Sequence, residues 1–217
     1  MKYISKKVQE NIDKFVNMSN DKFDSYMTTT YPELFRQRNL TIYDSPMAQG
    51  FGIYPGWFGV LELLAQELDK FRIDTGIIVE FAQIKEKFAD ACFYYDCVNS
   101  KNIDDNNYNY LKYFVRERVS HYENICGYID SYSGKPIDRE DRVISGAWMY
   151  TYGIDSAKKL WSERCNEDEI KEVVENLEAK IKDKKERKKI ADCISWHKIE
   201  KKDLDKIKKI IEKYLEK

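Results

Sequence analysis

The chain has 217 residues and a formal net charge of −1, with 42% hydrophobic and 35% charged residues. The hydrophobic content suffices for a buried core, which excludes a wholly disordered chain, and the balanced charge excludes a global attraction to nucleic acid or anionic membranes. No run of about 18 apolar residues is present, so the sequence predicts no membrane-spanning helix, and the N-terminus lacks the apolar stretch of a secretion signal. Five scattered cysteines without C-x-x-C spacing indicate reduced thiols and a cytoplasmic protein.

The N-terminal part of the chain predicts two helices followed by irregular backbone. Apolar residues at helical spacing indicate an amphipathic helix over residues 3–17, and Asn20 or Asp21 is a suitable cap for a second helix. Pro32 indicates a break with proline at a helix start. Residues 40–56 contain two prolines and three glycines, which predicts a loop or short extended pieces whose glycines serve turns.

The middle of the chain contains the clearest helix and a pair of strands. Residues 57–71 carry one apolar stripe and are predicted to be buried; the stripe consists of Trp57, Val60, Leu61, Leu64, Leu68 and Phe71. The β-branched, partly alternating residues 77–85 predict a strand, and residues 91–95 predict a second one that pairs with it as a hairpin. Cys92 is expected to be a small core residue of that second strand.

A further helix and a small hairpin are predicted after this pair of strands. The polar residues 99–109 indicate a surface loop, and apolar residues at helical spacing predict a long helix over 110–125. Residues 128–147 predict a loop with a small hairpin toward Trp148. Asp155 is a suitable cap for a short helix through Trp161.

The composition shifts at about Cys165, and two amphipathic helices are predicted beyond it, over 170–181 and 204–215. Their narrow apolar stripes need a partner surface, which either the rest of the chain or a second copy in a homodimer would supply. The predicted fold class is α+β, a small antiparallel β-sheet or hairpin packed by helices, with a helical C-terminal extension. The segments are N-terminal helices over 1–30, an α+β core over 31–164 and the extension over 165–217.

Five short motifs occur in order in the central part of the chain, namely Tyr31-Pro32-Glu33-Leu34-Phe35, Gly50-Phe51, Gly56-Trp57-Phe58, Ile84-Lys85-Glu86-Lys87-Phe88 and Phe93-Tyr94-Tyr95. In order and spacing, residues 31–160 resemble a widespread family of small, uncharacterised phage and prophage proteins. The resemblance implies a phage origin and an α+β core. It brings no established activity with it.

Members of that family often end in a small zinc ribbon with a C-x-x-C-G knuckle. In the register that the resemblance gives, the ligand positions hold Asp130, Ser133, Gly153 and Ser156. A second register places Cys126 at one ligand position, with Glu123 as its mate. A structural zinc site needs four Cys or His ligands, and neither register supplies them. We therefore expect a lost zinc site, no metal and no cofactor.

The only candidate catalytic set lies on the first predicted strand and consists of Glu80, Gln83 and Lys85. A carboxylate followed by an acid or glutamine and then a lysine is typical of magnesium nucleases, in which the acids hold the metal and the lysine steadies the attacking water. Gln83 and Lys85 would share one face, and Glu62 or Asp90 would supply a second acid. A half-buried strand with charged outer positions has the same pattern, so both interpretations stay open. The two histidines, His121 and His197, lie in different regions and do not predict a relay.

A basic run occupies residues 182–189 and offers a candidate contact with nucleic acid. Its binding residues would be Lys184, Lys185, Arg187, Lys188 and Lys189, which could touch phosphate groups of a nucleic-acid backbone. A solvated helix face or linker has the same composition, so this alternative also stays open.

The chain contains 16 tyrosines, a residue that suits protein–protein contact because it is amphipathic and loses little rotamer entropy on ordering. With the phage resemblance and the missing catalytic set, this composition predicts an accessory protein, more a binder than an enzyme. It would bind a host or phage protein in the cytoplasm of the host cell, and inhibition of a bacterial defence system is the most concrete version. The alternatives are a metal-dependent nuclease and a nucleic-acid-binding protein.

Overall fold

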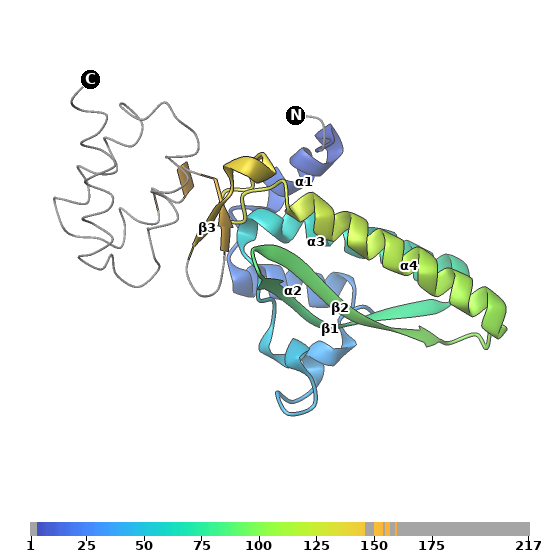
Figure 1. Cartoon of the computed structure of the whole chain (residues 1–217). Helices are drawn as coiled ribbons and strands as arrows, with labels where there is room; N and C mark the ends of the chain where they lie inside the picture. Colours follow the sequence, from blue (N-terminus) through green and yellow to red (C-terminus); the bar gives the residue numbers. More distant parts are fainter. Residues whose placement is uncertain (1–3, 146–149, 154, 157–158, 160–217) are drawn as a thin grey trace, which may run out of the picture. The chain divides into compact units, whose positions relative to one another are not determined.

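A computed structural model describes residues 4–145, 150–153, 155–156 and 159 of the chain (Figure 1). The chain divides into two compact units, Met1–Pro136 and Ile137–Lys217. The second unit contains the short 3-10 helix η4 (Arg139–Asp141) and an antiparallel hairpin of β3 (Val143–Ser145) and β4 (Tyr150–Tyr152). This hairpin corresponds to the small one predicted from the sequence. The described residues do not include Trp148, most of the helix predicted after Asp155, or the predicted C-terminal helices.

The first unit begins with two helices, each of which has a serine at its N-cap position. α1 (Lys6–Phe15) follows Ser5, whose hydroxyl accepts a hydrogen bond from the Val8 amide at 3.3 Å, as expected of an N-cap. α2 (Asn20–Thr30) has Ser19 at its N-cap position, so the cap predicted at Asn20 or Asp21 is wrong by one or two residues. Both helices confirm the amphipathic patterns, since Ile12 and Phe23 are fully buried.

The loop predicted over residues 40–56 contains two short 3-10 helices, and a third precedes it. They are η1 (Arg36–Asn39), η2 (Pro46–Gln49) and η3 (Pro55–Trp57), and η3 leads directly into α3 (Phe58–Thr75). No helix begins at Pro32, where the chain forms a turn instead. α3 ends at Gly76, whose φ of 81° is the left-handed conformation that glycine adopts at a helix C-terminus without a steric penalty.

A long antiparallel hairpin forms the sheet of the first unit. β1 (Ile77–Lys87) and β2 (Asp90–Asn99) pair along their whole length, which confirms the predicted hairpin and extends its second strand. Each outer edge of the hairpin makes a contact with another segment. Gly52 pairs with Lys85 at the β1 edge, and the Phe93 amide at the β2 edge donates to the Glu123 carboxylate of α4 at 2.7 Å.

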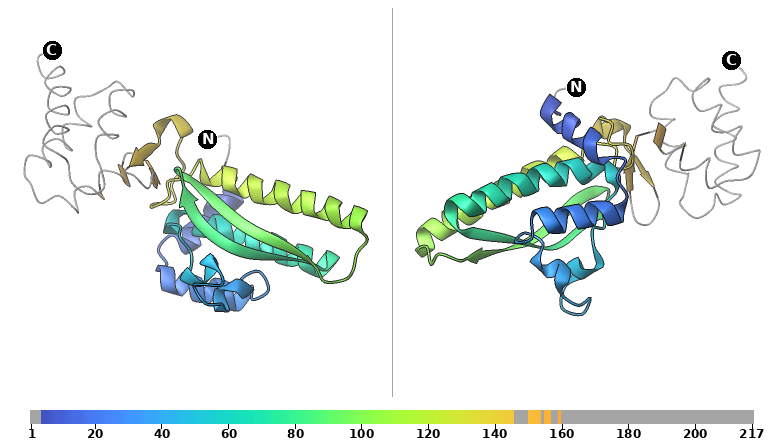
Figure 2. Two further views of the ribbon diagram at one scale, coloured as in Figure 1. Left: turned by 60° about the horizontal axis from the view of Figure 1, so that its bottom comes forward. Right: turned by 180° about the vertical axis from the view of Figure 1, so that it is seen from behind.

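α4 (Asp105–Cys126) begins five residues earlier than predicted. The polar segment taken for loop contains its first turn, because the Asp104 carboxylate accepts a hydrogen bond from the Asn107 amide at 3.1 Å and caps the helix. α4 contacts β2, and α3 contacts both α4 and β1. The two long helices therefore run side by side, in opposite directions, along the hairpin (Figure 2). This arrangement of helices on a small antiparallel sheet confirms the α+β class.

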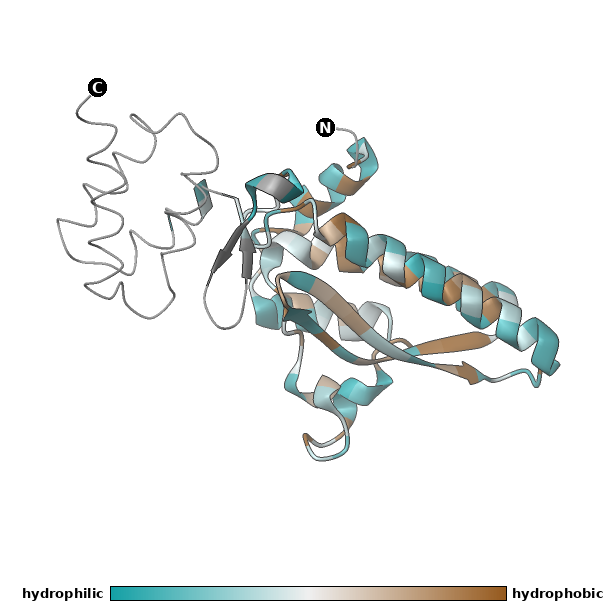
Figure 3. Cartoon of the chain, viewed as in Figure 1, coloured by the Kyte–Doolittle hydropathy of each residue, from teal (hydrophilic) through white to brown (hydrophobic). Residues whose placement is uncertain are grey.

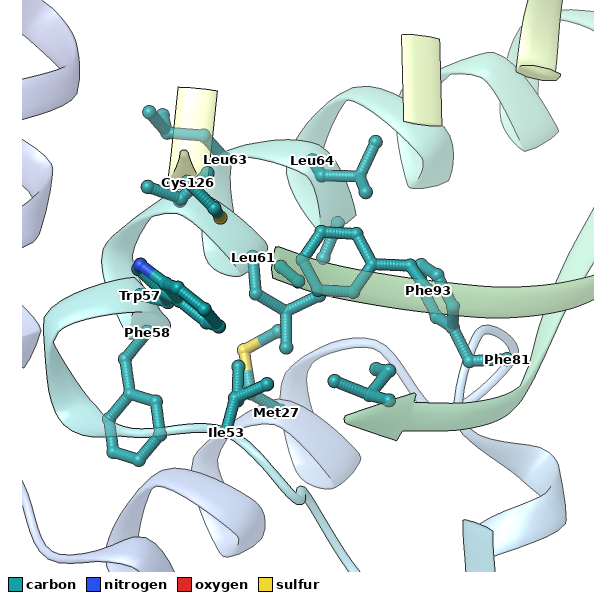
Figure 4. Packing of buried hydrophobic residues seen from close by; sticks show 14 of the residues in the cluster. Met27, Ile53, Trp57, Phe58, Leu61, Leu63, Leu64, Phe81, Phe93 and Cys126 are labelled. Carbon is teal, nitrogen blue, oxygen red and sulfur yellow. The ribbon is translucent and has the colours of Figure 1, made fainter. Parts of the chain in front are cut away.

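The core lies between the hairpin and the helices, and Trp57 is its largest buried side chain (Figure 4). Trp57 Nε1 donates to the Ile129 carbonyl at 3.1 Å, which ties the start of α3 to the segment after α4. α1 crosses α3 at Gly59, where an added Cβ would lie 2.5 Å from the Ile12 Cα. Only glycine allows two helix backbones to approach this closely. Cys92 is only partly buried, whereas Cys126 is fully buried, so the expected core cysteine is the wrong one.

Candidate functional site

A β-bulge in β1 brings the predicted strand residues to one face of the hairpin. In a regular strand Glu80 and Gln83 would point to opposite faces, because side chains alternate. The register shifts between Phe81 and Gln83, so Ala82 is an extra residue on this strand. As a result Glu80, Gln83 and Lys85 all lie on the face opposite the buried Phe81 and Ile84.

The side chains around Glu80, Gln83 and Lys85 differ from those expected of a metal centre. Glu80 lies directly opposite Asp96 of β2, and its Oε1 accepts a hydrogen bond from Arg36 Nη1 at 3.2 Å. The Lys85 ammonium lies 5.2 Å from the centroid of the Tyr94 ring. Among the residues that the structure describes, no group of three or more His, Cys, Asp or Glu side chains could hold a metal ion. On this face Glu80 therefore already has a cationic partner, Arg36.

The two acids considered as a second metal ligand have other neighbours. Asp90 is the β-ladder partner of Lys87 beside the turn of the hairpin, and its charge contributes to the raised pKa values of Glu86 and Glu123. Glu62 of α3 is 1% exposed and accepts hydrogen bonds from four side chains; these are Asn11 and Tyr31 at 2.8 Å, Gln66 at 2.8 Å and Tyr26 at 3.3 Å. Burial, reinforced by the Glu62 carboxylate, raises the pKa of Tyr31, so its hydroxyl stays a donor at neutral pH. Glu62 is the centre of a buried polar network that joins α1, α2 and α3.

A second group of acids lies near the turn of the hairpin and the end of α4. The Glu86 carboxylate accepts a hydrogen bond from the Ala89 amide at 2.6 Å, yet burial and the neighbouring Asp90 raise the pKa of Glu86 to about 7. Burial also raises the pKa of Glu123, with a smaller contribution from Asp90. The Cys126 thiol has a raised pKa because it is fully buried, so it stays protonated and is a poor nucleophile.

The segment predicted to be a lost zinc knuckle forms a tight turn held by a carboxylate. Asp130 Oδ1 accepts hydrogen bonds from the Tyr132 and Ser133 amides at 2.9 and 2.8 Å, and Gly134 adopts a φ of 69°. The Asp130 side chain thus stabilises the turn within the chain. The basic residues Lys184, Lys185, Arg187, Lys188 and Lys189 lie outside the described residues, so contact with nucleic acid through them stays a prediction.

Among the described residues, the side chains that most resemble a binding site lie on the exposed face of α4. Tyr110 and Tyr113 are 72% and 58% exposed, and Phe114 is also exposed. Their spacing of three and four residues places them next to one another on the helix surface. The Phe114 ring stacks on Phe71 of α3 with centroids 5.2 Å apart, which fixes its position. We call Tyr110, Tyr113 and Phe114 the aromatic face. In Figure 3 apolar and polar residues alternate along this helix.

A second exposed apolar site was not recognised in the sequence. Leu40, Ile42 and Tyr43 lie in the loop between η1 and η2, and all three are exposed. The prolines and glycines of this segment predicted only a loop. The signal that could have found the site is three large apolar side chains within four residues of a predicted loop.

No protein-family model, no curated protein and no solved structure matches this chain. No helix among residues that the structure describes combines the length and the apolar character needed to cross a bilayer.

Proposed function

We propose that this chain is a phage-encoded accessory protein that acts by binding a protein of the bacterial host, and that it inhibits a host defence system. The observation that carries the binding proposal is the aromatic face of α4. Large aromatic side chains of a monomer are usually buried, and a group of them on one exposed helix face is characteristic of a protein-binding surface. The phage origin rests on the resemblance of residues 31–160.

The chemistry of the aromatic face suits a protein partner. Tyrosine contributes a large contact area and a hydroxyl group, and it loses little conformational entropy because it has only two side-chain torsions. Phe114 is held by its stacking on Phe71, so part of the ordering cost of binding is met before the partner arrives. The aromatic face therefore combines two adaptable tyrosines with one fixed ring.

The proposal predicts a stoichiometric complex and a gain of phage growth. The full chain, bound to a resin through a tag, should retain one host protein in a 1:1 or other simple ratio from a bacterial lysate. The chain is then expressed in a set of bacterial strains, each of which carries one defence system. Plaque formation by a phage that is sensitive to that system should be restored in the strain that encodes the retained protein. Retention of no stoichiometric protein, together with unchanged plaque formation in every strain, would refute the proposal.

A metal-dependent nuclease is the second candidate, because the bulge at Ala82 places Glu80, Gln83 and Lys85 on one face and Asp96 opposite Glu80. Incubation of the purified chain with DNA or RNA in Mg²⁺ or Mn²⁺ tests it. Under the binding proposal we expect no cleavage above that of a Lys85→Ala control. Cleavage that Lys85→Ala abolishes would favour the nuclease, since Lys85 is partly exposed and its replacement should leave the fold intact.

A further inference from the structure

The turn that joins β1 to β2 has a strained backbone conformation. Only Phe88 and Ala89 separate the two strands, and both have a positive φ, of 54° and 68°. Two-residue hairpin turns of this kind favour asparagine and glycine, because a residue with a Cβ is disfavoured in the left-handed region. The Phe88 ring is exposed, whereas Ala89 is fully buried. The turn therefore persists only where contacts with its neighbours offset the backbone strain.

Glu86, the residue before Lys87 in β1, supplies contacts that hold this turn. Its backbone amide donates to the Gly52 carbonyl at 2.9 Å, and its side-chain Oε1 accepts a hydrogen bond from the Ala89 amide at 2.6 Å. A buried amide without a partner is costly, so the bond to Ala89 stabilises its left-handed conformation. We call the form in which this bond is made the closed turn. The Glu86 side chain is part of that form and is half-buried in it.

Two further carboxyl groups lie near the closed turn. Asp90 is the first residue of β2, and its negative charge acts on Glu86 and on Glu123 of α4. Glu123 is tied to the same strand, because its Oε1 accepts a hydrogen bond from the Phe93 amide at 2.7 Å. A carboxyl group that is partly withdrawn from water beside another carboxylate favours its protonated, neutral form. The arrangement therefore favours a bound proton at this end of the hairpin.

The other ionisable neighbours keep a constant charge near neutral pH. The ammonium groups of Lys85 and Lys87 in β1 lie beside aromatic rings and carry one positive charge each. Burial raises the pKa of the Cys92 thiol in β2 and of the Cys126 thiol in α4, so both stay neutral. Residues 50–53, which pair with β1 through Gly52, contain no ionisable side chain. A change of charge near pH 7 is therefore confined to the carboxyl groups.

We propose that the turn of the β1–β2 hairpin is a pH-sensitive conformational device, in which a proton bound to Glu86 stabilises the closed turn and its loss loosens the turn. In the closed turn the pKa of Glu86 is raised to about 7, mainly by burial, whereas a solvated glutamate of an open turn has a pKa of about 4.3. Between these two values the closed turn binds a proton that the open turn has released. The closed turn therefore becomes less stable as the pH rises through this range. The inference does not depend on the proposed function.

Carbon-13 NMR of the full chain, labelled at the glutamate carboxyl carbons, measures the titration of Glu86 directly. We expect a signal with a midpoint at about pH 7 that is missing from the spectrum of the Glu86→Gln variant. Glu10, which is exposed on α1, is the matched control and should titrate near the ordinary value of about 4.3. A midpoint of Glu86 close to that of Glu10 would overturn the inference.

Hydrogen exchange of the Ala89 amide measures the loosening of the turn. Its protection factor, which is corrected for the intrinsic exchange rate, should be about tenfold lower at about pH 8 than at about pH 5.5. Glu86→Gln keeps an oxygen that accepts the bond but cannot ionise, so its protection factor should be equal at both pH values. Glu10→Gln should keep the pH dependence of the natural chain. Equal protection at both pH values in the natural chain, or an unchanged dependence in Glu86→Gln, would overturn the inference.

Discussion

Replacing Trp57 with alanine is expected to lower the free energy of unfolding by about 4 kcal/mol, the largest loss that we expect from any single change in this chain. The indole is fully buried at the start of α3, and its Nε1 donates to the Ile129 carbonyl at 3.1 Å. Alanine would leave a cavity in the core and a buried carbonyl without its donor, and both effects destabilise the folded state. Urea denaturation followed by circular dichroism measures the loss.

Two control variants separate the causes of this loss. Trp57→Phe keeps most of the apolar volume and removes the hydrogen bond, so it should cost about 2 kcal/mol. Tyr43→Ala removes an exposed aromatic ring from the loop between η1 and η2 and should change the free energy of unfolding by less than about 0.5 kcal/mol. A loss below about 1 kcal/mol for Trp57→Ala would contradict the placement of this ring in the core.

The variant Glu62→Leu should lose about 3 kcal/mol of stability, because it removes the common acceptor of a buried network. The Glu62 carboxylate accepts hydrogen bonds from Asn11 of α1, Gln66 of α3 and both Tyr26 and Tyr31. Leucine restores the volume and removes the cost of burying a charge, but it leaves these donors without an acceptor. Unmade hydrogen bonds of buried donors outweigh the gain in apolar packing.

A double-mutant cycle tests whether the network acts as described. Tyr31→Phe removes one donor, so Glu62→Leu should cost less in that background than in the natural chain, with a coupling of about 1 kcal/mol. The exposed Glu10 of α1 is the matched control, since Glu10→Leu should change stability by less than about 0.5 kcal/mol. If the two changes at 62 and 31 are additive, the hydrogen bond between them does not stabilise the fold.

Periodicity of the sequence was sufficient to predict the elements that form the core. The apolar stripe of residues 57–71 predicted α3, and Gly76 marks its end. The β-branched residues of 77–85 predicted β1 and the hairpin. These patterns are local consequences of burial on one face, so they can be read without knowledge of the tertiary contacts.

The parts that the sequence analysis missed depend on contacts between distant residues or on caps. The first turn of α4 resembles a loop in composition, and the cap at Asp104 decides its start. The bulge at Ala82 changes which side chains share a face, and neither propensity nor alternation indicates it. Glu62 resembled a possible metal ligand, but its neighbours come from helices up to 51 residues away in the chain.

The central claim, that this chain binds a host protein through the aromatic face of α4, is tested most directly by the affinity for the retained host protein. Isothermal titration calorimetry should show that the double variant Tyr110→Ala/Tyr113→Ala binds at least about 30-fold more weakly than the natural chain, with unchanged stability. Ser120→Ala, an exposed position further along α4, should bind like the natural chain. Equal affinities of the double variant and the natural chain would contradict the claim.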